Sequence, residues 1–270
     1  MKTTRRSFLK VTAAGMTGLA LSPATRAAKD QNGPGRNFVL VHGAWHGGWC
    51  WKRVTKLLAN AGHRVFTPTL TGLGDRKHLL SSEVSFATHY QDVMGTIEWE
   101  ELEDVILVGH SLGGVTISGV ADQMPERIKQ LIYLDAVLLE SGSRWSEAVP
   151  PEVAVTRRKL AQESTGGLSL PPPKASVFGI YPAADQAWVE RRMTPQPFRT
   201  FDEVIHLAGP LGNHLPKIYI DCVEPALPTL VAMKTLYRGR ADWPFVEIKC
   251  GHDAMIAAPA ELAQILLRFV

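Results

Sequence analysis

Cysteine is scarce in this sequence: Cys50, Cys222 and Cys250 are the only three among 270 residues. A disulfide framework is therefore excluded, and a single Cys222–Cys250 bridge stays open. The spacing of the cysteines matches no metal site, and we expect neither a metal nor a cofactor. Charged residues make up 20% of the chain, too few for a disordered tail, while the 45% that are hydrophobic are typical of a globular protein.

The chain also has no excess of positive charge outside its first 27 residues. Lys2, Arg5, Arg6, Lys10 and Arg26 all lie in that segment, and without them 24 basic side chains face 26 acidic ones. A faintly acidic body repels a polyanion, so we expect no nucleic acid as a partner. Internal repeats and low-complexity runs are absent as well.

The N-terminus has the pattern of an export signal. Residues 4–10 read Thr-Arg-Arg-Ser-Phe-Leu-Lys, and a mildly apolar stretch follows at residues 11–21. This stretch is well short of the roughly 20 residues that span a bilayer, so we expect a cleaved signal peptide over 1–28 and no stable membrane anchor. The pattern predicts export by the twin-arginine machinery of a bacterium and a periplasmic or secreted protein.

Short apolar runs alternate with helical patterns in the rest of the chain. After a linker at 29–36, buried strands are expected at residues 38–41, 64–67, 105–108, 131–134, 218–220 and 245–248. Helices are expected at 49–61, 90–99, 112–123, 230–237 and 259–269. This alternation predicts an α/β protein with a mostly parallel sheet that helices cover on both faces.

The alternation is interrupted over residues 137–210. Prolines cluster in this segment with helical fragments between them, which predicts an inserted helical cap. Its aromatic side chains are expected to line a pocket for an apolar group, although packing within the cap accounts for any single one of them. They are Trp145, Phe178, Trp188, Phe198 and Phe201.

A serine lies in a glycine-rich turn between an expected strand and an expected helix. Residues 109–113 read Gly-His-Ser-Leu-Gly, which is the pattern of a nucleophile elbow. The tiny flanking residues permit a sharp, strained turn that lifts the hydroxyl clear of the sheet. We therefore expect Ser111 to be a catalytic nucleophile.

His252 is the expected base, because a serine hydroxyl needs a neighbouring group that accepts its proton. Of nine histidines it alone follows the last expected strand, and the carboxyl ends of parallel strands meet at one edge of a sheet.

The loop after the first expected strand lies at the same edge of the sheet. An oxyanion hole takes one backbone N–H from that loop and one from the residue after the nucleophile, which points to Ala44 and Leu112. His42, in the same loop, is expected to hydrogen-bond loop backbone and not a metal.

Three carboxylates compete to orient the imidazole. Asp135 ends the strand after the elbow helix, Asp221 lies late in the next strand, and Glu224 lies just beyond it. Burial in an apolar strand end is costly for an unpaired carboxylate, so Asp135 needs a partner and is preferred. Asp253 is badly placed to reach the ring of its neighbour His252, and we expect it to be a loop or helix-capping residue.

Residues 38–49, the turn at 109–114 and Gly-His-Asp-Ala-Met at 251–255 together resemble the α/β-hydrolase superfamily. The branch that the chain resembles most holds plant methylesterases, hydroxynitrile lyases and bacterial pyrethroid-hydrolase-like esterases. The similarity covers the expected domain at 37–270 and is weakest in the cap. It implies an α/β-hydrolase fold without the first two strands of larger members, a helical lid and no cofactor. The family's serine and histidine roles carry onto Ser111 and His252, and its oxyanion amides onto Ala44 and Leu112. From the cap aromatics, we expect a small hydrophobic ester as the substrate.

Two departures from this family bear on the prediction. Plant members place the acid shortly after the strand at 218–220, but here that segment is one residue short and has Pro225 near the expected aspartate, which favours Asp135. The lyases carry a lysine after the catalytic histidine and a threonine at the place of Gly43, where this chain has Asp253 and Gly43. We expect an esterase. A hydroxynitrile lyase or other non-hydrolytic reaction and a non-catalytic binding homologue are the alternatives.

Overall fold

A computed structural model describes residues 35–270 of the chain. The predicted signal peptide at 1–28 and most of the predicted linker at 29–36 lie outside these residues. The described part contains a six-stranded parallel sheet with the strand order β2-β1-β3-β4-β7-β8. The strands are β1 (Asn37–Val41), β2 (Arg64–Phe66), β3 (Val105–His110), β4 (Ile128–Leu134), β7 (Lys217–Cys222) and β8 (Phe245–Ile248). The predicted fold class is confirmed.

The central strands are continuous apolar runs because both faces of the sheet are covered. Every residue of β3 is buried, and Val39 and Leu40 of β1 pair in register with Leu107 and Val108 of β3. β4 begins at Ile128, three residues before the predicted start, because Ile128 and Gln130 pair with Val105 and Ile106 of β3 on either side of a register shift at Lys129. Apolar content alone does not mark those residues as strand.

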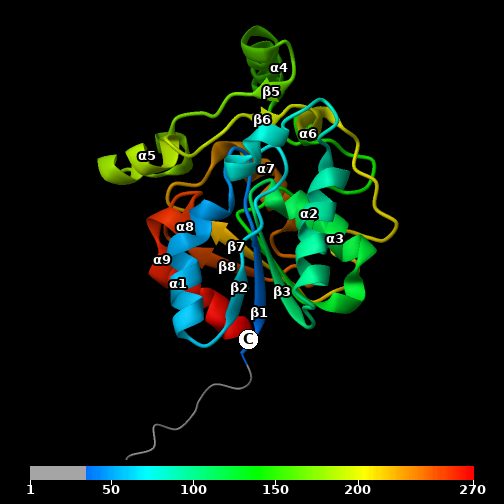
Figure 1. The fold of residues 1–270 in the computed structure, drawn as a ribbon, viewed down its shortest axis with the longest axis vertical. Helices are drawn as coiled ribbons and strands as arrows, with labels where there is room; N and C mark the ends of the chain where they lie inside the picture. Colours follow the sequence, from blue (N-terminus) through cyan, green and yellow to red (C-terminus); the bar gives the residue numbers. More distant parts are fainter. Residues whose placement is uncertain (1–34) are drawn as a thin grey trace, which may run out of the picture. The chain divides into compact units, whose positions relative to one another are not determined.

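Helices cover the two faces of the sheet (Figure 1). α1 (Lys52–Asn60) packs with α9 (Pro259–Leu266) on one face, and α2 (Phe86–Trp99) packs with α3 (Gly113–Gln123) on the other. α2 starts four residues before the predicted start, because Ser85 and Thr88 form a capping box at its N-terminus. α3 lies so near α2 that a Cβ atom at Gly119 would lie 2.2 Å from the Tyr90 ring.

Residues 137–210, called the cap below, connect β4 to β7. The cap contains α4 (Pro151–Thr165), α5 (Ala183–Glu190), α6 (Arg199–Asp202) and the short antiparallel pair β5 (Ser169–Leu170) and β6 (Gln196–Pro197). Figure 1 shows α4, β5, β6 and α6 beyond the carboxyl ends of the central strands. The β5–β6 pair was not predicted, because two residues on each side leave no alternating pattern.

Two further short helices lie near the carboxyl ends of the last strands. They are α7 (Pro228–Tyr237), after β7, and α8 (Ala254–Ala257), after β8. Among residues 35–270, no helix combines the length and apolar character needed to cross a membrane.

Candidate active site

Ser111 lies in the sharp turn from β3 into α3. Its φ of 52° is in the left-handed region, which residues other than glycine rarely adopt. A Cβ atom at Gly109 would lie 2.6 Å from the Gly113 carbonyl oxygen, and one at Gly113 would lie 2.7 Å from the His42 carbonyl oxygen. The end of β3, the start of α3 and the loop after β1 can therefore approach this closely only because positions 109 and 113 are glycines. This is the reason the motif requires a glycine on each side of the serine.

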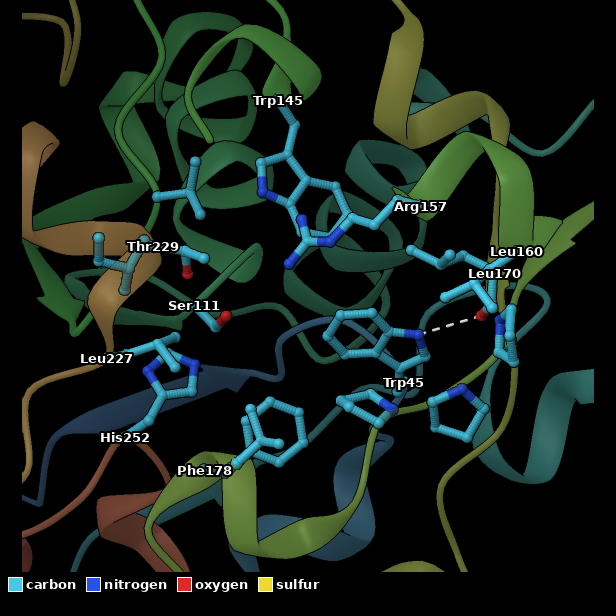
Figure 2. Close-up of a pocket in the computed structure, with 16 residues that line it drawn as sticks. Trp45, Ser111, Trp145, Arg157, Leu160, Leu170, Phe178, Leu227, Thr229 and His252 are labelled. Atoms are coloured by element: carbon cyan, nitrogen blue, oxygen red, sulfur yellow. Dashed lines mark hydrogen bonds between the residues drawn. The ribbon is translucent and has the colours of Figure 1, made fainter. Parts of the chain in front are cut away.

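His252 and Asp135 meet at the same edge of the sheet. His252 follows β8 and Asp135 follows β4, and the His252 Nδ1 atom lies 2.6 Å from Asp135 Oδ2. A carboxylate only accepts, so the ring N–H at Nδ1 donates and Nε2 is left as the acceptor. Both side chains are buried, His252 lines the same cavity as Ser111, and Figure 2 shows its ring beside the serine side chain. Ser111, His252 and Asp135 are thus brought together from three separate loops.

The other two candidate acids lie elsewhere. Asp221 forms ion pairs with Lys234, at 2.6 Å, and with Arg238. Glu224 is exposed to solvent. Of the three carboxylates, only that of Asp135 makes a hydrogen bond with the His252 ring within the described residues.

Lys234, on α7, is a partner of Asp135 that the sequence analysis missed. Its Nζ atom lies 2.9 Å from Asp135 Oδ1 and 2.6 Å from Asp221 Oδ1, and the side chain is buried. Burial opposes ionisation of Asp135, but His252 and the Lys234 ammonium outweigh it and lower the pKa of this carboxyl. The signal in the sequence was a lone lysine among apolar residues in a predicted helix, which needs a carboxylate if it is buried.

We predict that Lys234→Met moves the acid limb of the kcat/KM profile to higher pH. The Lys234 ammonium is one of the groups that lower the pKa of the Asp135 carboxyl, so without it this carboxyl is protonated at a higher pH. A protonated Asp135 no longer stabilises the imidazolium that forms when His252 accepts the serine proton. Initial rates on a neutral ester between pH 4 and 9 measure the shift.

Lys234→Arg retains the positive charge and is the matched control, with an acid limb close to that of the wild type. An unmoved limb in a folded Lys234→Met protein would show that the lysine supports the structure and does not tune the site.

The loop after β1 supplies the first of the two amides predicted for an oxyanion hole. Ala44 and Leu112 are both buried, and neither backbone N–H donates to an acceptor within residues 35–270. The loop contacts the nucleophile closely, since a Cβ atom at Gly43 would lie 2.5 Å from Ser111 Cβ.

His42 makes hydrogen bonds with backbone groups, as predicted. Its Nδ1 atom lies 2.8 Å from the Gly43 carbonyl oxygen, and the Leu70 N–H donates to Nε2 at 3.0 Å. Burial lowers the pKa of His42 to about 3, so the ring is neutral.

Asp253 lies in the loop before α8, as predicted, but the alternative prediction that it caps the helix is wrong. It lies at the N-cap position of α8, but its side chain makes no capping hydrogen bond. Its Oδ2 atom instead lies 3.0 Å from His46 Nε2, while His46 Nδ1 lies 2.7 Å from the Ala44 carbonyl oxygen. With two acceptors His46 donates from both nitrogens and is cationic, and the attraction of Asp253 outweighs burial and raises the pKa of His46. This pair joins the Ala44 loop to the residue after His252.

Among residues 35–270, one buried cluster has the composition of a metal site: His110, His252 and Asp253 offer ligand atoms within 4.8 Å of one another. Hydrogen bonds already engage these residues, because His110 Nε2 donates to the His252 carbonyl oxygen at 3.0 Å and the other two bond Asp135 and His46. Burial lowers the pKa of His110 to about 3, so this ring is neutral as well. We assign the cluster to the hydrogen-bond network of the site. Cys50, Cys222 and Cys250 are free thiols.

A cavity of about 310 Å³ opens above Ser111 and His252. Most of its lining is apolar and comes from the cap (Figure 2). Of the five cap aromatics, Trp145 and Phe178 line it. The other three pack against neighbours: Phe201 against Trp145, Phe198 against Phe201, and Trp188 against Trp49. Trp45 also lines the cavity and was missed; its indole N–H donates to the Leu170 carbonyl oxygen of β5 at 3.0 Å.

A serine in a strand–turn–helix elbow beside a histidine–aspartate pair, on a parallel sheet, is the arrangement of an α/β-hydrolase. Residues 38–265 match the alpha/beta hydrolase family, and the chain belongs to this family. It is 45% identical to a carbendazim hydrolyzing esterase of Nocardioides sp. over 240 residues, which are 85% of this chain and 98% of that protein. Within the family, the chain is a carboxylic ester hydrolase.

Solved structures agree with this assignment. An extracellular α/β-hydrolase from a Paenibacillus species superposes with a TM-score of 0.75 at 25% identity and covers 86% of this chain and 98% of that one. A pyrethroid hydrolase from Sphingobium faniae superposes with a TM-score of 0.65 at 25% identity and covers 87% of this chain and 96% of that one.

Proposed function

We propose that the chain hydrolyses small, largely apolar carboxylic esters through an acyl-enzyme on Ser111. The observation that carries this proposal is the 2.6 Å hydrogen bond between His252 Nδ1 and Asp135 beside Ser111 at the base of the cavity. Because Nδ1 donates to Asp135, Nε2 is free to accept the Ser111 proton as Oγ attacks the ester carbonyl carbon. The negative oxygen that forms is stabilised by the Ala44 and Leu112 amides.

The intermediate then breaks down in two stages. The tetrahedral adduct collapses, the bond to the alcohol oxygen breaks, and His252 gives its proton to the departing alcohol. Water next attacks the acyl-enzyme while His252 accepts one of its protons. Collapse of the second adduct releases the carboxylic acid and returns the proton to Ser111. Throughout, the Asp135 carboxylate stabilises the imidazolium.

The lining of the cavity supports an apolar substrate. Trp45, Trp145 and Phe178 surround the space above Ser111, and aromatic walls of this kind bury flat or branched apolar groups. Relatives act on carbendazim and on pyrethroids, as their names state. Esters with a comparable apolar part are therefore our proposed substrates.

The proposal is tested with a fluorophosphonate probe and a panel of p-nitrophenyl and methyl esters. We expect the probe to label Ser111 and the labelled protein to lose ester turnover. A protein that neither takes the label nor cleaves any ester of the panel contradicts the proposal. It would support the non-catalytic alternative.

The site also opposes the lyase alternative. The residue after His252 is the buried anion Asp253, so it supplies no cation for a departing cyanide. At position 43 a Cβ atom would lie 2.5 Å from Ser111 Cβ, which leaves no room for a threonine. Mandelonitrile should therefore yield no cyanide above the background rate.

We propose in addition that the full chain is exported through its Arg5-Arg6 motif. The motif supports this, as does the extracellular Paenibacillus relative. In a bacterial host, we expect the wild type in the periplasmic fraction and an Arg5→Lys/Arg6→Lys double variant in the cytoplasm. The same fraction for both proteins would contradict the proposal.

A further inference from the structure

Arg157, on α4 of the cap, contributes a charge to an otherwise apolar cavity. Of the sixteen residues that line the cavity above Ser111 in the described part of the chain, it is the one whose side chain carries a permanent charge. Figure 2 shows it turned into the cavity beside Trp145. The rest of the lining is apolar or aromatic, apart from Ser111, His252 and Thr229.

This guanidinium has no anionic partner within residues 35–270. Its Nη1 atom is buried and makes no hydrogen bond with any of these residues. Two other arginines of the cap are paired: Arg158 lies 2.6 Å from Asp202, and Arg144 lies 3.9 Å from Glu147. Arg157 forms no such ion pair within the described part of the chain.

Three aromatic rings surround the guanidinium and compensate its charge in part. Its Cζ atom lies 4.7 Å from the centre of the Trp145 ring, 5.5 Å from that of Phe201 and 5.8 Å from that of Trp45. Burial lowers the pKa of Arg157 to about 10, so the side chain is still charged at neutral pH. Ring faces attract a cation but accept no N–H in the strong, directional way of an oxygen atom.

A buried N–H group such as that of Arg157 Nη1 raises the free energy of the protein unless an acceptor on a ligand forms a hydrogen bond with it. A guanidinium is planar, and its fork of N–H groups matches a carboxylate group. The rings of Trp45 and Trp145 at the same cavity suit a flat apolar body next to that group.

We infer that Arg157 is a specificity-determining residue that binds a carboxylate group of the substrate. The substrate class is then a monoester whose flat, apolar body carries the ester at Ser111 and an anionic acceptor at its other end. This inference rests on the proposed function for the position of the ester. The binding by Arg157 is measured without catalysis.

The test uses two methyl esters of the same shape: monomethyl terephthalate, which has a carboxylate, and methyl 4-methylbenzoate, which has a methyl group in its place. Their binding to the Ser111→Ala protein is measured by calorimetry, so that no ester is consumed. We expect the anionic ester to bind at least about tenfold more tightly than the neutral one. Adding Arg157→Met should abolish that preference and leave the affinity for the neutral ester within about threefold.

Arg158→Met is the matched control, because Arg158 is the adjacent arginine and its partner is Asp202. It should leave both affinities unchanged. Arg157→Lys should keep part of the preference, since it retains the charge and loses the fork.

Equal affinities of the Ser111→Ala protein for the two esters overturn the inference. A preference for the anionic ester that survives the addition of Arg157→Met overturns it as well. An equal loss of both affinities in Arg157→Met also overturns it, because it assigns Arg157 to the packing of the cap aromatics. Failure of the proposed function has a different signature, namely turnover that does not depend on Ser111 or the lack of any fluorophosphonate label.

Discussion

We expect Ser111→Ala to lower kcat for a short-chain p-nitrophenyl ester by about 10⁶-fold, which leaves only the hydrolysis by water that the rest of the site supports. The variant has no atom that can form the acyl-enzyme, whereas the cavity and the Ala44 and Leu112 amides are retained. Because the missing interaction exists only during the reaction, the loss falls on kcat and not on KM. Steady-state kinetics on protein purified free of host esterases measure it.

Two controls separate this result from a folding defect. Ser82, which is exposed on the surface, serves as the matched serine, and Ser82→Ala should keep wild-type kcat. Thermal unfolding of Ser111→Ala should stay within a few degrees of the wild type, because the change removes one oxygen atom from a partly exposed side chain. Full turnover by Ser111→Ala would remove the basis of the proposed mechanism.

We expect Asp135→Asn to lower kcat by about 10⁴-fold. An asparagine amide at this place donates towards His252 Nδ1. The ring proton then moves to Nε2, which faces Ser111 and can no longer accept its proton. The buried Lys234 also loses one of its two carboxylates, so we expect a lower free energy of unfolding as well. kcat on a neutral ester and urea unfolding at pH 7 measure the two effects separately.

The other two carboxylates provide the comparison. Asp221→Asn should destabilise the fold, because Lys234 and Arg238 lose their shared partner, but it should lower kcat by less than about tenfold. Glu224→Gln, at an exposed position, should change neither kcat nor unfolding. If either variant loses as much activity as Asp135→Asn, Asp135 is not the acid.

Local patterns carried much of the prediction. β1 and β3 are continuous apolar runs, and such runs follow from burial on both faces of a parallel sheet. The elbow at Ser111 is equally local, because only glycine at positions 109 and 113 permits the backbones to pass at the distances that the structure shows. Chain order and strand ends were enough to select His252 among nine histidines. The strands and the elbow depend on residues close together in the sequence, whereas the selection of His252 depends on the order of the strands along the chain.

The partners of the buried charged side chains could not be predicted from the sequence. Lys234 contacts Asp135 across 99 residues, and His46 contacts Asp253 across 207. Such pairs depend on how α7 and the loop after β1 pack against strand ends, and no spacing within either segment encodes that. For the same reason the sequence did not reveal that Asp253 bonds a histidine and does not cap α8.

The sequence by itself determined the layered α/β architecture, the strained serine turn and the histidine beyond the last strand, because periodicity and backbone sterics act over a few residues. Only the tertiary structure showed that the Asp135 carboxylate lies against His252, that Lys234 shares it, and that Arg157 Nη1 has no hydrogen-bond partner among residues 35–270. All three features concern the interactions of charged side chains. A buried charge pairs with whatever the fold brings within about 3 Å, and that distance is set by packing between segments far apart in the chain.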